Sequence, residues 1–167
     1  MKKSLLVSIF VLIAGMAFSQ NYMVVNSQKI FQSIESYTQA VVELDTLASQ
    51  YQKRIENAYE KLDDMYNTYQ EGRAYMSDAQ RQASENEIIA AEQRITQFEE
   101  DIFGQEGEMI KKRIETLKPI QDKVFDVINK YAEENKFDLV LDIASNPTIL
   151  YYVPSKDKTQ QIINLLK

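Results

Sequence analysis

Apolar residues recur at spacings of three and four along the first half of the chain, and this is its clearest pattern. Neither proline nor glycine interrupts that stretch. The pattern predicts a helix from about Tyr37 to Tyr75 with a narrow, coiled-coil-like apolar seam. The seam positions are Leu44, Leu47, Tyr51, Ile55, Ala58, Leu62, Met65 and Tyr69.

A second seam follows after a predicted turn at Met76-Ser77-Asp78, where Ser77 and Gln80 have the spacing of a capping box. Its positions are Ile88, Ala91, Ile95, Phe98, Ile102 and Met109, continued by Leu117, Ile120, Val124, Val127 and Tyr131. The two helices should pair as an antiparallel hairpin over residues 37–115. Because a helix of this length extends roughly 57 Å, the hairpin should project into solvent as a tentacle.

Three residues can weaken the returning helix. Gly104 and Gly107 lie about halfway along it, and Pro119 near its base should kink it by crowding the carbonyl of Glu115. We expect a hinge at these residues. The alternative is that the two glycines are merely tolerated.

Residues 20–36 and 116–167 flank the hairpin and should form a small body that contains β-structure. Tyr22 to Asn26 reads as a buried strand, followed by a short helix that carries Ile30, Phe31 and Ile34. A capping box of Ser36 and Gln39 should start the long helix. Near the other end, period-two patterns predict a β-hairpin. Its strands would be Phe137–Asp142 and Thr148–Val153, joined by a Ser145-Asn146-Pro147 turn, and a helix capped by Ser155 or Asp157 would follow, burying Ile162, Ile163, Leu165 and Leu166.

The fold class expected is therefore α+β: a long helical hairpin on a small β-sheet body. Three short strands are a meagre core for a chain of this length, and they carry apolar side chains on both faces. Association through the sheet would cover its faces and edges. The residues expected at this oligomer interface are Tyr22, Val24, Leu139, Leu141, Tyr151 and Val153.

The N-terminal residues 1–19 have the pattern of a cleaved secretory signal peptide. Lys2 and Lys3 precede an uncharged apolar stretch from Leu5 to Ala14, and small residues follow at Ala17-Phe18-Ser19. The stretch is short for a membrane span, and no cysteine is present to carry a lipid anchor. A retained anchor is the alternative.

Composition excludes several function classes. Of 19 basic side chains, cleavage removes Lys2 and Lys3, so 17 face 25 acidic ones and the mature charge is −8. Such a chain lacks the basic face that nucleic acid requires. With no His or Cys, the usual general base, thiolate and zinc ligands are missing. We expect no enzyme, metal or cofactor, and interpret the carboxylate clusters Asp63-Asp64, Glu99-Glu100-Asp101 and Glu133-Glu134 as solvated helix faces.

The order of these elements, with two short motifs, resembles the Skp/OmpH family of periplasmic chaperones over the whole mature chain. The motifs are Val24-Val25-Asn26 followed by Ile30-Phe31, and Phe137-Asp138-Leu139-Val140-Leu141-Asp142 before Ile149-Leu150-Tyr151-Tyr152. The resemblance implies a periplasmic homotrimer whose strands build a central body. Its tentacles would enclose a cavity that holds unfolded outer-membrane proteins without ATP.

One departure limits this resemblance. Familiar members of the family are strongly basic, whereas this mature chain is acidic. Electrostatic capture of acidic clients and binding of lipopolysaccharide or anionic lipid therefore do not transfer to it.

A second, partial stripe beside each seam supplies the candidate client contacts: Tyr59 and Tyr66 on the outgoing helix, and Ile89, Phe103 and Ile110 on the returning one. Tyrosine suits weak, sequence-tolerant contact because it joins a large apolar face to a polar tip. Alternatively these residues simply widen the seam. A structural or scaffolding coiled coil that binds one specific partner in the envelope is the second function class that the periodicity allows.

Overall fold

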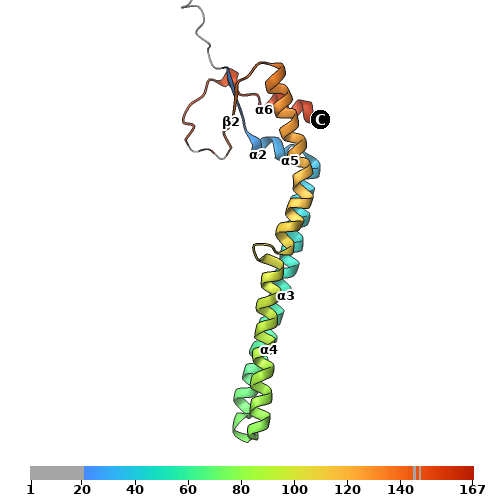
Figure 1. Ribbon diagram of the computed structural model, residues 1–167, viewed down its shortest axis with the longest axis vertical. Coiled ribbons are helices and arrows are strands. Elements are labelled where there is room, and N and C mark those ends of the chain that lie inside the picture. Colours follow the sequence, from blue (N-terminus) through green and yellow to red (C-terminus); the bar gives the residue numbers. More distant parts are fainter. Residues whose placement is uncertain (1–20, 145, 147) are drawn as a thin grey trace, which may run out of the picture. The chain divides into compact units, whose positions relative to one another are not determined.

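The computed structural model describes residues 21–144, 146 and 148–167, so the predicted signal peptide lies outside the described residues. Figure 1 shows the order of the elements along the chain. They are β1 (Tyr22–Val25), α2 (Ser27–Gln32), α3 (Glu35–Gly72), η1 (Arg73–Tyr75), α4 (Asp78–Phe103), α5 (Glu108–Glu134), β2 (Leu139–Asp142), η2 (Pro154–Lys156) and α6 (Thr159–Leu166).

The chain divides into two compact units. We call residues 34–123 the hairpin unit, and residues 21–33 together with 124–167 the sheet unit. Helix α5 contributes its first part to the hairpin unit and its last part to the sheet unit. Each unit is described by itself.

In the hairpin unit, α3 runs antiparallel to α4, as Figure 1 shows. The 38 residues of α3 correspond to about 57 Å of helix. The helix begins at Glu35, after Ile34 in the capping position, and no side chain caps it. The prediction that a Ser36–Gln39 capping box starts this helix was wrong. Gln39 instead donates from Nε2 to Oε1 of Glu35, one turn before it, at 3.1 Å.

The turn at the tip of the hairpin confirms the predicted capping box. Helix α3 ends at Gly72, one 3₁₀ turn follows, and Ser77 occupies the capping position of α4. The backbone N–H of Gln80 donates to Oγ of Ser77 at 3.4 Å. In return, the Ser77 N–H donates to Oε1 of Gln80 at 2.8 Å. Two otherwise unpaired donors of the first turn are thereby satisfied.

The predicted seams form the core of the hairpin unit, in two clusters. One is built on Ala40, Leu44, Ile102, Met109 and Leu117, and the other on Ile55, Leu62, Tyr69, Ile88 and Ile95. Half-buried neighbours complete them, among them Tyr51, Ala58, Met65, Ala91 and Phe98. The core is therefore a single row of side chains from each helix, because each helix has only one neighbour to pack against.

The returning arm of the hairpin consists of two helices instead of the single one predicted. Helix α4 ends at Phe103, Gly104 takes the C-terminal capping position, and α5 begins at Glu108. The backbone turns so tightly here that a Cβ atom on Gly104 would lie 2.4 Å from the Glu100 carbonyl oxygen. A Cβ on Gly107 would lie 2.6 Å from the Ile102 carbonyl oxygen. Pro119 lies inside α5, which continues past it to Glu134.

The sheet unit contains two parallel strands from opposite ends of the described chain. Tyr22 pairs with Leu139, and Val25 pairs with Asp142. At the end of β2, the Asp142 carboxylate accepts hydrogen bonds from the backbone N–H groups of Ser27, at 3.1 Å, and Ala144, at 2.9 Å. Burial raises the pKa of Asp142, but the hydrogen bonds from Ser27 and Ala144 outweigh it, and the net pKa is lowered.

The predicted β-hairpin was wrong. Strand β2 is present, but residues 148–153 form no strand, so the sheet has two described strands instead of three. The predicted partner of residues 148–153 was β2, whose second edge has no paired strand among the described residues. The backbone N–H groups of Thr148 and Ile149 are bonded instead to Oδ1 and to the carbonyl of Asn146, at 3.1 and 3.3 Å, so the chain turns where the strand pairing would begin. On the other side of the sheet, β1 is bordered by residues 157 and 158, through a bridge of Val24 with Asp157 and a 2.9 Å bond from the Lys158 N–H to the Val24 carbonyl.

Small helices and aromatic side chains complete the sheet unit. Met23, Val24, Ile30, Val124 and Ile162 are fully buried. Asn26 caps α2 as predicted, because its side chain accepts from the Lys29 N–H at 2.9 Å. Asp157, one of the two caps predicted for the last helix, accepts from the Thr159 N–H at 2.9 Å, although Lys158 occupies the capping position.

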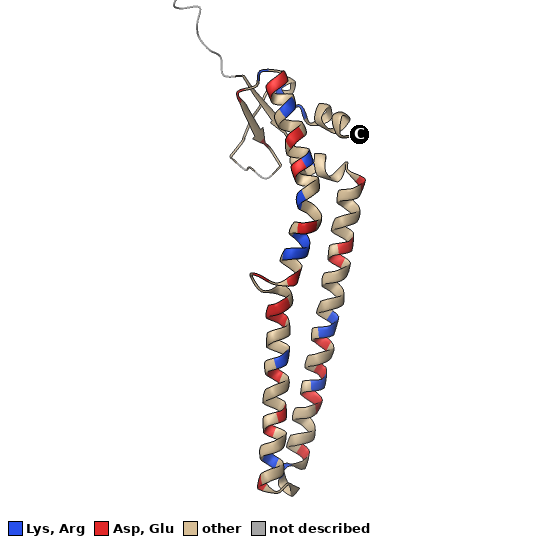
Figure 2. Ribbon diagram, turned by 45° about the vertical axis from the view of Figure 1, so that its right-hand side comes forward, with Lys and Arg blue, Asp and Glu red and all other residues tan. Residues whose placement is uncertain are grey.

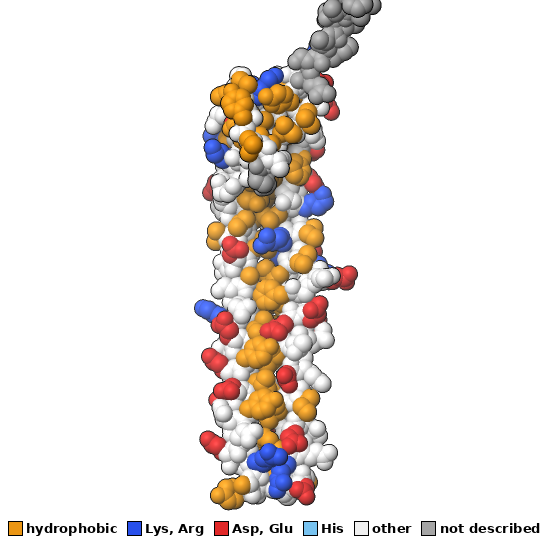
Figure 3. Space-filling view, turned by 90° about the vertical axis from the view of Figure 1, so that its left-hand side faces the viewer, with side chains coloured by type: hydrophobic (Ala, Val, Ile, Leu, Met, Phe, Trp, Pro, Cys, Tyr) orange, Lys and Arg blue, Asp and Glu red, His pale blue; other side chains and the backbone are white. Residues whose placement is uncertain are grey.

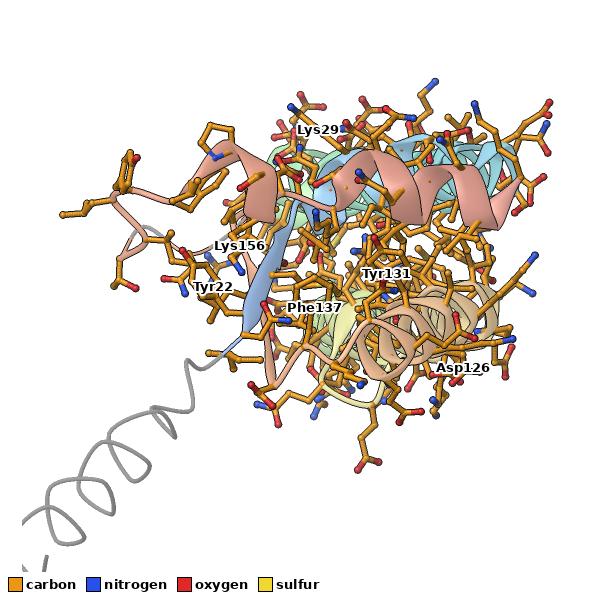
Figure 4. The ribbon with its side chains drawn as sticks, turned by 90° about the horizontal axis from the view of Figure 1, so that it is seen from above. Tyr22, Lys29, Asp126, Tyr131, Phe137 and Lys156 are labelled. Atoms are coloured by element: carbon orange, nitrogen blue, oxygen red, sulfur yellow. The ribbon has the colours of Figure 1, made fainter. Side chains whose placement is uncertain are left out.

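In Figure 4 the Lys156 side chain lies near Tyr22 and Phe137. Its ammonium nitrogen is 5.3 Å from the ring centre of Tyr22 and 6.0 Å from that of Phe137. The Phe137 ring in turn stacks on Tyr131, with 6.3 Å between ring centres. The Lys156 ammonium also donates to Oδ1 of Asn21 at 2.9 Å. Through these contacts the start of β1 is connected to Phe137, just after α5, and to Lys156, just before α6.

Candidate functional site

The five predicted client contacts all lie at the surface of the hairpin unit, beside its packed seam. Each keeps between 41% and 49% of its surface exposed: Tyr59, Tyr66, Ile89, Phe103 and Ile110. The buried residues of the seam between them are less than a tenth exposed, for example Leu62 and Ile95 at 7% each, and others such as Met65 and Phe98 are half-buried. The stripe is thus physically distinct from the core, with half of each side chain available to a partner.

Helical geometry places the two tyrosines on one flank of the seam. Tyr59 and Tyr66 are seven residues apart, so they point in nearly the same direction about 10.5 Å apart along α3. The Tyr59 hydroxyl donates to Oε2 of Glu99 on α4 at 3.3 Å. Its polar tip is therefore held by the opposite helix, while part of the ring stays exposed.

Three tyrosines on α3 hydrogen-bond glutamates on the returning arm. Besides Tyr59, the Tyr51 hydroxyl donates to Oε1 of Glu108 at 2.8 Å, and the Tyr69 hydroxyl donates to Glu85. The pKa of Tyr51 and that of Tyr69 are raised mainly by these hydrogen bonds, and that of Tyr59 mainly by desolvation, followed by the charge of Glu99. The bonds link the two arms at three levels along the hairpin.

Charged residues of both signs line the arms of the hairpin unit (Figure 2). On the face turned to the viewer in Figure 3, hydrophobic side chains form a line along the hairpin, with charged side chains on both sides. Such a surface joins a continuous apolar contact line to a solvated border.

Several exposed apolar residues were missed by the sequence analysis. Ile114 is 55% exposed and lies four residues after Ile110, so the helical repeat itself would have extended the stripe to it. Tyr75, at 91% exposure, lies in the turn at the tip, where no repeat marks it.

The residues predicted for the oligomer interface fall into two groups in the sheet unit. Leu139, Tyr151 and Val153 are 49%, 81% and 44% exposed, and Tyr22 and Leu141 are half-buried. Val24, in contrast, is fully buried within the single chain. A hollow of about 480 Å³ is lined by Tyr22, Val24, Leu139, Leu141 and residues 148–152. Leu150, which was not among the predicted interface residues, is one of the lining residues and is 92% exposed.

Neither a metal site nor a membrane-spanning helix is found in the part of the chain that the structure describes. No group of three or more His, Cys, Asp or Glu side chains there could hold a metal ion. No described helix is both long and apolar enough to cross a bilayer.

Comparison with known proteins identifies the family. The model of the family described as "Outer membrane protein (OmpH-like)" matches residues 21–166. An uncharacterized protein of Aquifex aeolicus (strain VF5) is 26% identical over 159 residues, covering 95% of this chain and 93% of its own length. The resemblance found in the sequence is thereby confirmed. The chain belongs to the OmpH-like family, whose proteins are periplasmic, and this membership suggests a chaperone-type role.

Proposed function

We propose that this protein is an ATP-independent holding chaperone, which binds unfolded outer-membrane or other envelope proteins and prevents their aggregation. The observation that supports this most directly is the stripe of half-exposed apolar side chains beside a seam whose central residues are buried. A coiled coil that served only as a spacer would have no need to keep tyrosine, phenylalanine and isoleucine in water.

The stripe suits weak, repeated contact with an unfolded chain. Tyr59 and Tyr66 expose ring faces about two helical turns apart. On the returning arm, Phe103 exposes aromatic surface and Ile110 exposes aliphatic surface. Each contact by itself is weak, which allows later release. Together, inside a cavity between tentacles, they retain a client through high effective concentration. No step in this scheme consumes a nucleotide.

We further propose that three copies assemble through their sheet units. Leu139, Tyr151 and Val153 expose apolar surface, Leu139 and Tyr151 line the same hollow, and β2 is an edge strand. Exposed strand edges that carry apolar side chains are prone to pair with another chain. In Figure 3, hydrophobic side chains also gather on the sheet unit. Assembly would cover this surface and supply the central body; the mass of the mature protein in solution tests the number of copies.

Periplasmic location and processing form part of the proposal. Cleavage after Ser19 would release a chain of charge −8, which gives no reason to expect direct binding of lipopolysaccharide or of an anionic membrane. The N-terminal mass of the secreted protein tests the cleavage. A mass that includes residues 1–19 would replace the soluble chaperone with an anchored one.

The decisive experiment measures light scattering as several unrelated outer-membrane β-barrels are diluted from denaturant, without nucleotide. The wild-type protein should suppress aggregation of all of them. Changing Tyr59, Tyr66 and Phe103 together to serine should weaken the suppression while the oligomer stays intact. A matched control changes Val42 and Tyr75, which are 64% and 91% exposed but lie outside the stripe. If the triple variant loses its oligomer or its helices, these residues belong to the packing instead.

The second candidate function is a structural coiled coil that binds one specific envelope partner. The hydrogen bonds of Tyr51, Tyr59 and Tyr69 to the returning arm favour it, because they stiffen the hairpin as a spacer requires. The same scattering assay separates the two functions. Failure to suppress aggregation of any unrelated client would leave the scaffold as the better description.

A further inference from the structure

A row of carboxylates lies on α4 beside the stripe. Glu85, Glu92 and Glu99 follow one another at intervals of seven residues, so they point in nearly the same direction, about 10.5 Å apart along the helix. We call them the carboxylate row. The Tyr59 hydroxyl on α3 donates to Oε2 of Glu99 at 3.3 Å, and the Tyr69 hydroxyl donates to Glu85. The row therefore lies on the flank of the seam that carries the exposed Tyr59 ring.

The stripe residues of α4 lie on the outer side of this row. Ile89 follows Glu85 by four residues and precedes Glu92 by three, and Phe103 follows Glu99 by four, so each shares a patch of helix surface with the row. Because each residue turns the helix by about 100°, the row falls between the buried seam and these two side chains. A hollow of about 690 Å³ continues this surface, and its lining contains two carboxylates and no cation: Ile89, Glu92, Gln93, Thr96, Gln97 and Glu100.

No cation of the described residues forms an ion pair with the carboxylate row. The ion pairs found there join Arg81 to Asp78, Lys118 to Asp122 and Lys130 to Glu134. The pKa of Tyr59 is raised mainly by desolvation, and further by the charges of Glu99 and Glu92. In Figure 3, acidic side chains border the line of hydrophobic side chains along the hairpin. Negative charge without a cationic partner thus lies next to exposed apolar surface.

The chain itself contains an example of the cation that such a surface accepts. At the tip end of the row, the Arg73 guanidinium lies 5.8 Å from the ring centre of Tyr69, and the hydroxyl of the same tyrosine donates to Glu85. A cation attracted by an aromatic face is thereby combined with a carboxylate bonded to that ring. In the part of the chain that the structure describes, no Lys or Arg lies over the ring of Tyr59 or Tyr66. These two rings remain open to cations of a partner.

We propose that the stripe and the carboxylate row together bind extended segments of an unfolded polypeptide in which apolar and basic residues are mixed. The inference rests on the proposed holding function and names the class of client segment. Apolar side chains of the segment would cover Ile89 and Phe103, and its lysines and arginines would lie over Tyr59 and Tyr66 and meet the carboxylates. Aromatic faces and carboxylates both attract cations, so both stabilise the same partner. The preference is opposite in sign to the capture of acidic clients by basic members of the family.

The spacing of the row favours an extended chain over a single small cation. The three carboxylates extend over about 21 Å of α4, which is too far for one metal ion to meet more than one of them. In an extended chain, side chains on one face are roughly 7 Å apart at a separation of two residues and 13 Å at four. The flexible stems of lysine and arginine cover the difference from 10.5 Å. A segment of about eight residues can therefore reach the whole row.

The test is a titration of the full mature protein with labelled short peptides, followed by fluorescence anisotropy. The probe peptide is built from lysine, leucine and serine. In two matched peptides, glutamate replaces the lysines or serine replaces the leucines. The probe should bind about tenfold more tightly than either, and its advantage over the glutamate peptide should shrink with added salt. Equal or tighter binding of the glutamate peptide would overturn the proposal.

A triple variant locates the binding. Changing Glu85, Glu92 and Glu99 together to glutamine should weaken binding of the probe by about tenfold. Glutamine keeps an oxygen that accepts the tyrosine hydroxyls, so the helical content should stay unchanged in circular dichroism. Glu92 accepts no hydrogen bond from a tyrosine, and Glu92→Lys alone therefore guards against a folding defect. This single change should weaken binding by about fivefold, and unchanged binding would remove Glu92 from the site.

A matched control removes the same charge elsewhere on the hairpin unit. It changes three exposed glutamates to glutamine: Glu43, Glu87 and Glu115. Binding of the probe should stay within about twofold of the wild type. An equal loss in the control and in the row variant would assign the effect to overall charge and overturn the proposal.

Three further outcomes separate this inference from the proposed function and from self-association. Unchanged probe binding in the row variant, with normal suppression of client aggregation in the scattering assay, would overturn the inference and leave the holding function intact. A wild-type protein that prefers the basic probe but suppresses no aggregation would support the peptide surface and overturn the holding function. Loss of the oligomer in the row variant, measured by sedimentation, would assign the row to contacts with a second copy and overturn the inference.

Discussion

The hairpin unit and the sheet unit use their apolar residues in different ways. In the hairpin unit, residues spaced three and four apart pack into a seam, and only a partial stripe remains half-exposed. In the sheet unit, paired residues such as Tyr22 and Leu139 are far apart in sequence, and Leu150 and Tyr151 stay almost fully exposed. The hairpin is complete within one chain apart from its stripe, whereas the sheet unit leaves apolar surface that one chain does not cover.

The largest expected effect on stability comes from placing a charge in the core of the sheet unit, compared with placing the same charge at its surface. Val24→Asp places a charge at a fully buried position and should cost more than about 3 kcal/mol, because the carboxylate has no partner there. Hydrogen exchange should show loss of protection in β1, β2 and α6. Leu139→Asp, at a position that is 49% exposed, should preserve this protection.

The same pair of variants tests the proposed assembly. Leu139→Asp should convert the oligomer to monomers, as measured by sedimentation, because the charge would enter the proposed interface. An unaltered oligomer would remove Leu139 from that interface. Leu139→Asn provides the control for a polar change without charge.

Next in size is the difference between seam and stripe in the hairpin unit. Leu62→Ala should destabilise the hairpin by about 2 to 3 kcal/mol, since it removes buried methyl groups from a core that can partly collapse. Tyr66→Ala, at 41% exposure, should cost less than about 1 kcal/mol. Thermal unfolding followed by circular dichroism measures both. Equal costs would assign Tyr66 to the seam and weaken its role as a client contact.

A smaller effect is expected at the break in the returning arm. Gly107→Ala should lower the free energy of unfolding of the hairpin unit by about 1 to 3 kcal/mol. The added Cβ would overlap the Ile102 carbonyl, and this backbone group can move only if the chain itself shifts. Alanine favours a helix over glycine by about 1 kcal/mol, which opposes this cost. Gly72→Ala is the control, because its Cβ would meet only the end of the flexible Met76 side chain, at 3.0 Å. A more stable Gly107→Ala variant would indicate that the returning arm prefers one continuous helix.

The smallest effect concerns pH. The pKa values of Tyr51, Tyr59 and Tyr69 are raised above 10.0, so the neutral hydroxyl is favoured in the folded hairpin. The contribution of these groups to stability is complete below pH 10.0 and is lost as the pH rises through the raised values. Changing all three tyrosines to phenylalanine should therefore flatten the fall of the unfolding temperature above pH 10.0.

Sequence analysis succeeded where the pattern is local. The seams, the turn at Ser77, the strand at Tyr22 and the cap at Asn26 all depend on residues within a few positions of one another. The five stripe residues were also located correctly at the surface, because their seven-residue spacing follows the helix. Their role in binding clients stays a prediction. The hydrogen bonds across the hairpin escaped notice, since Tyr59 and Glu99 are 40 positions apart and only the pairing of α3 with α4 brings them together.

The periodicity of this chain by itself determined that two long arms fold back on one another, since an apolar seam on a helix can be buried only against a second such seam. Only the tertiary structure decided which backbone groups pair in the sheet. Residues 148–153 have the composition of a strand but pair with neither strand, whereas residues 157 and 158 border β1. Strand pairing joins segments that are far apart in sequence, and no local pattern records which segments become neighbours.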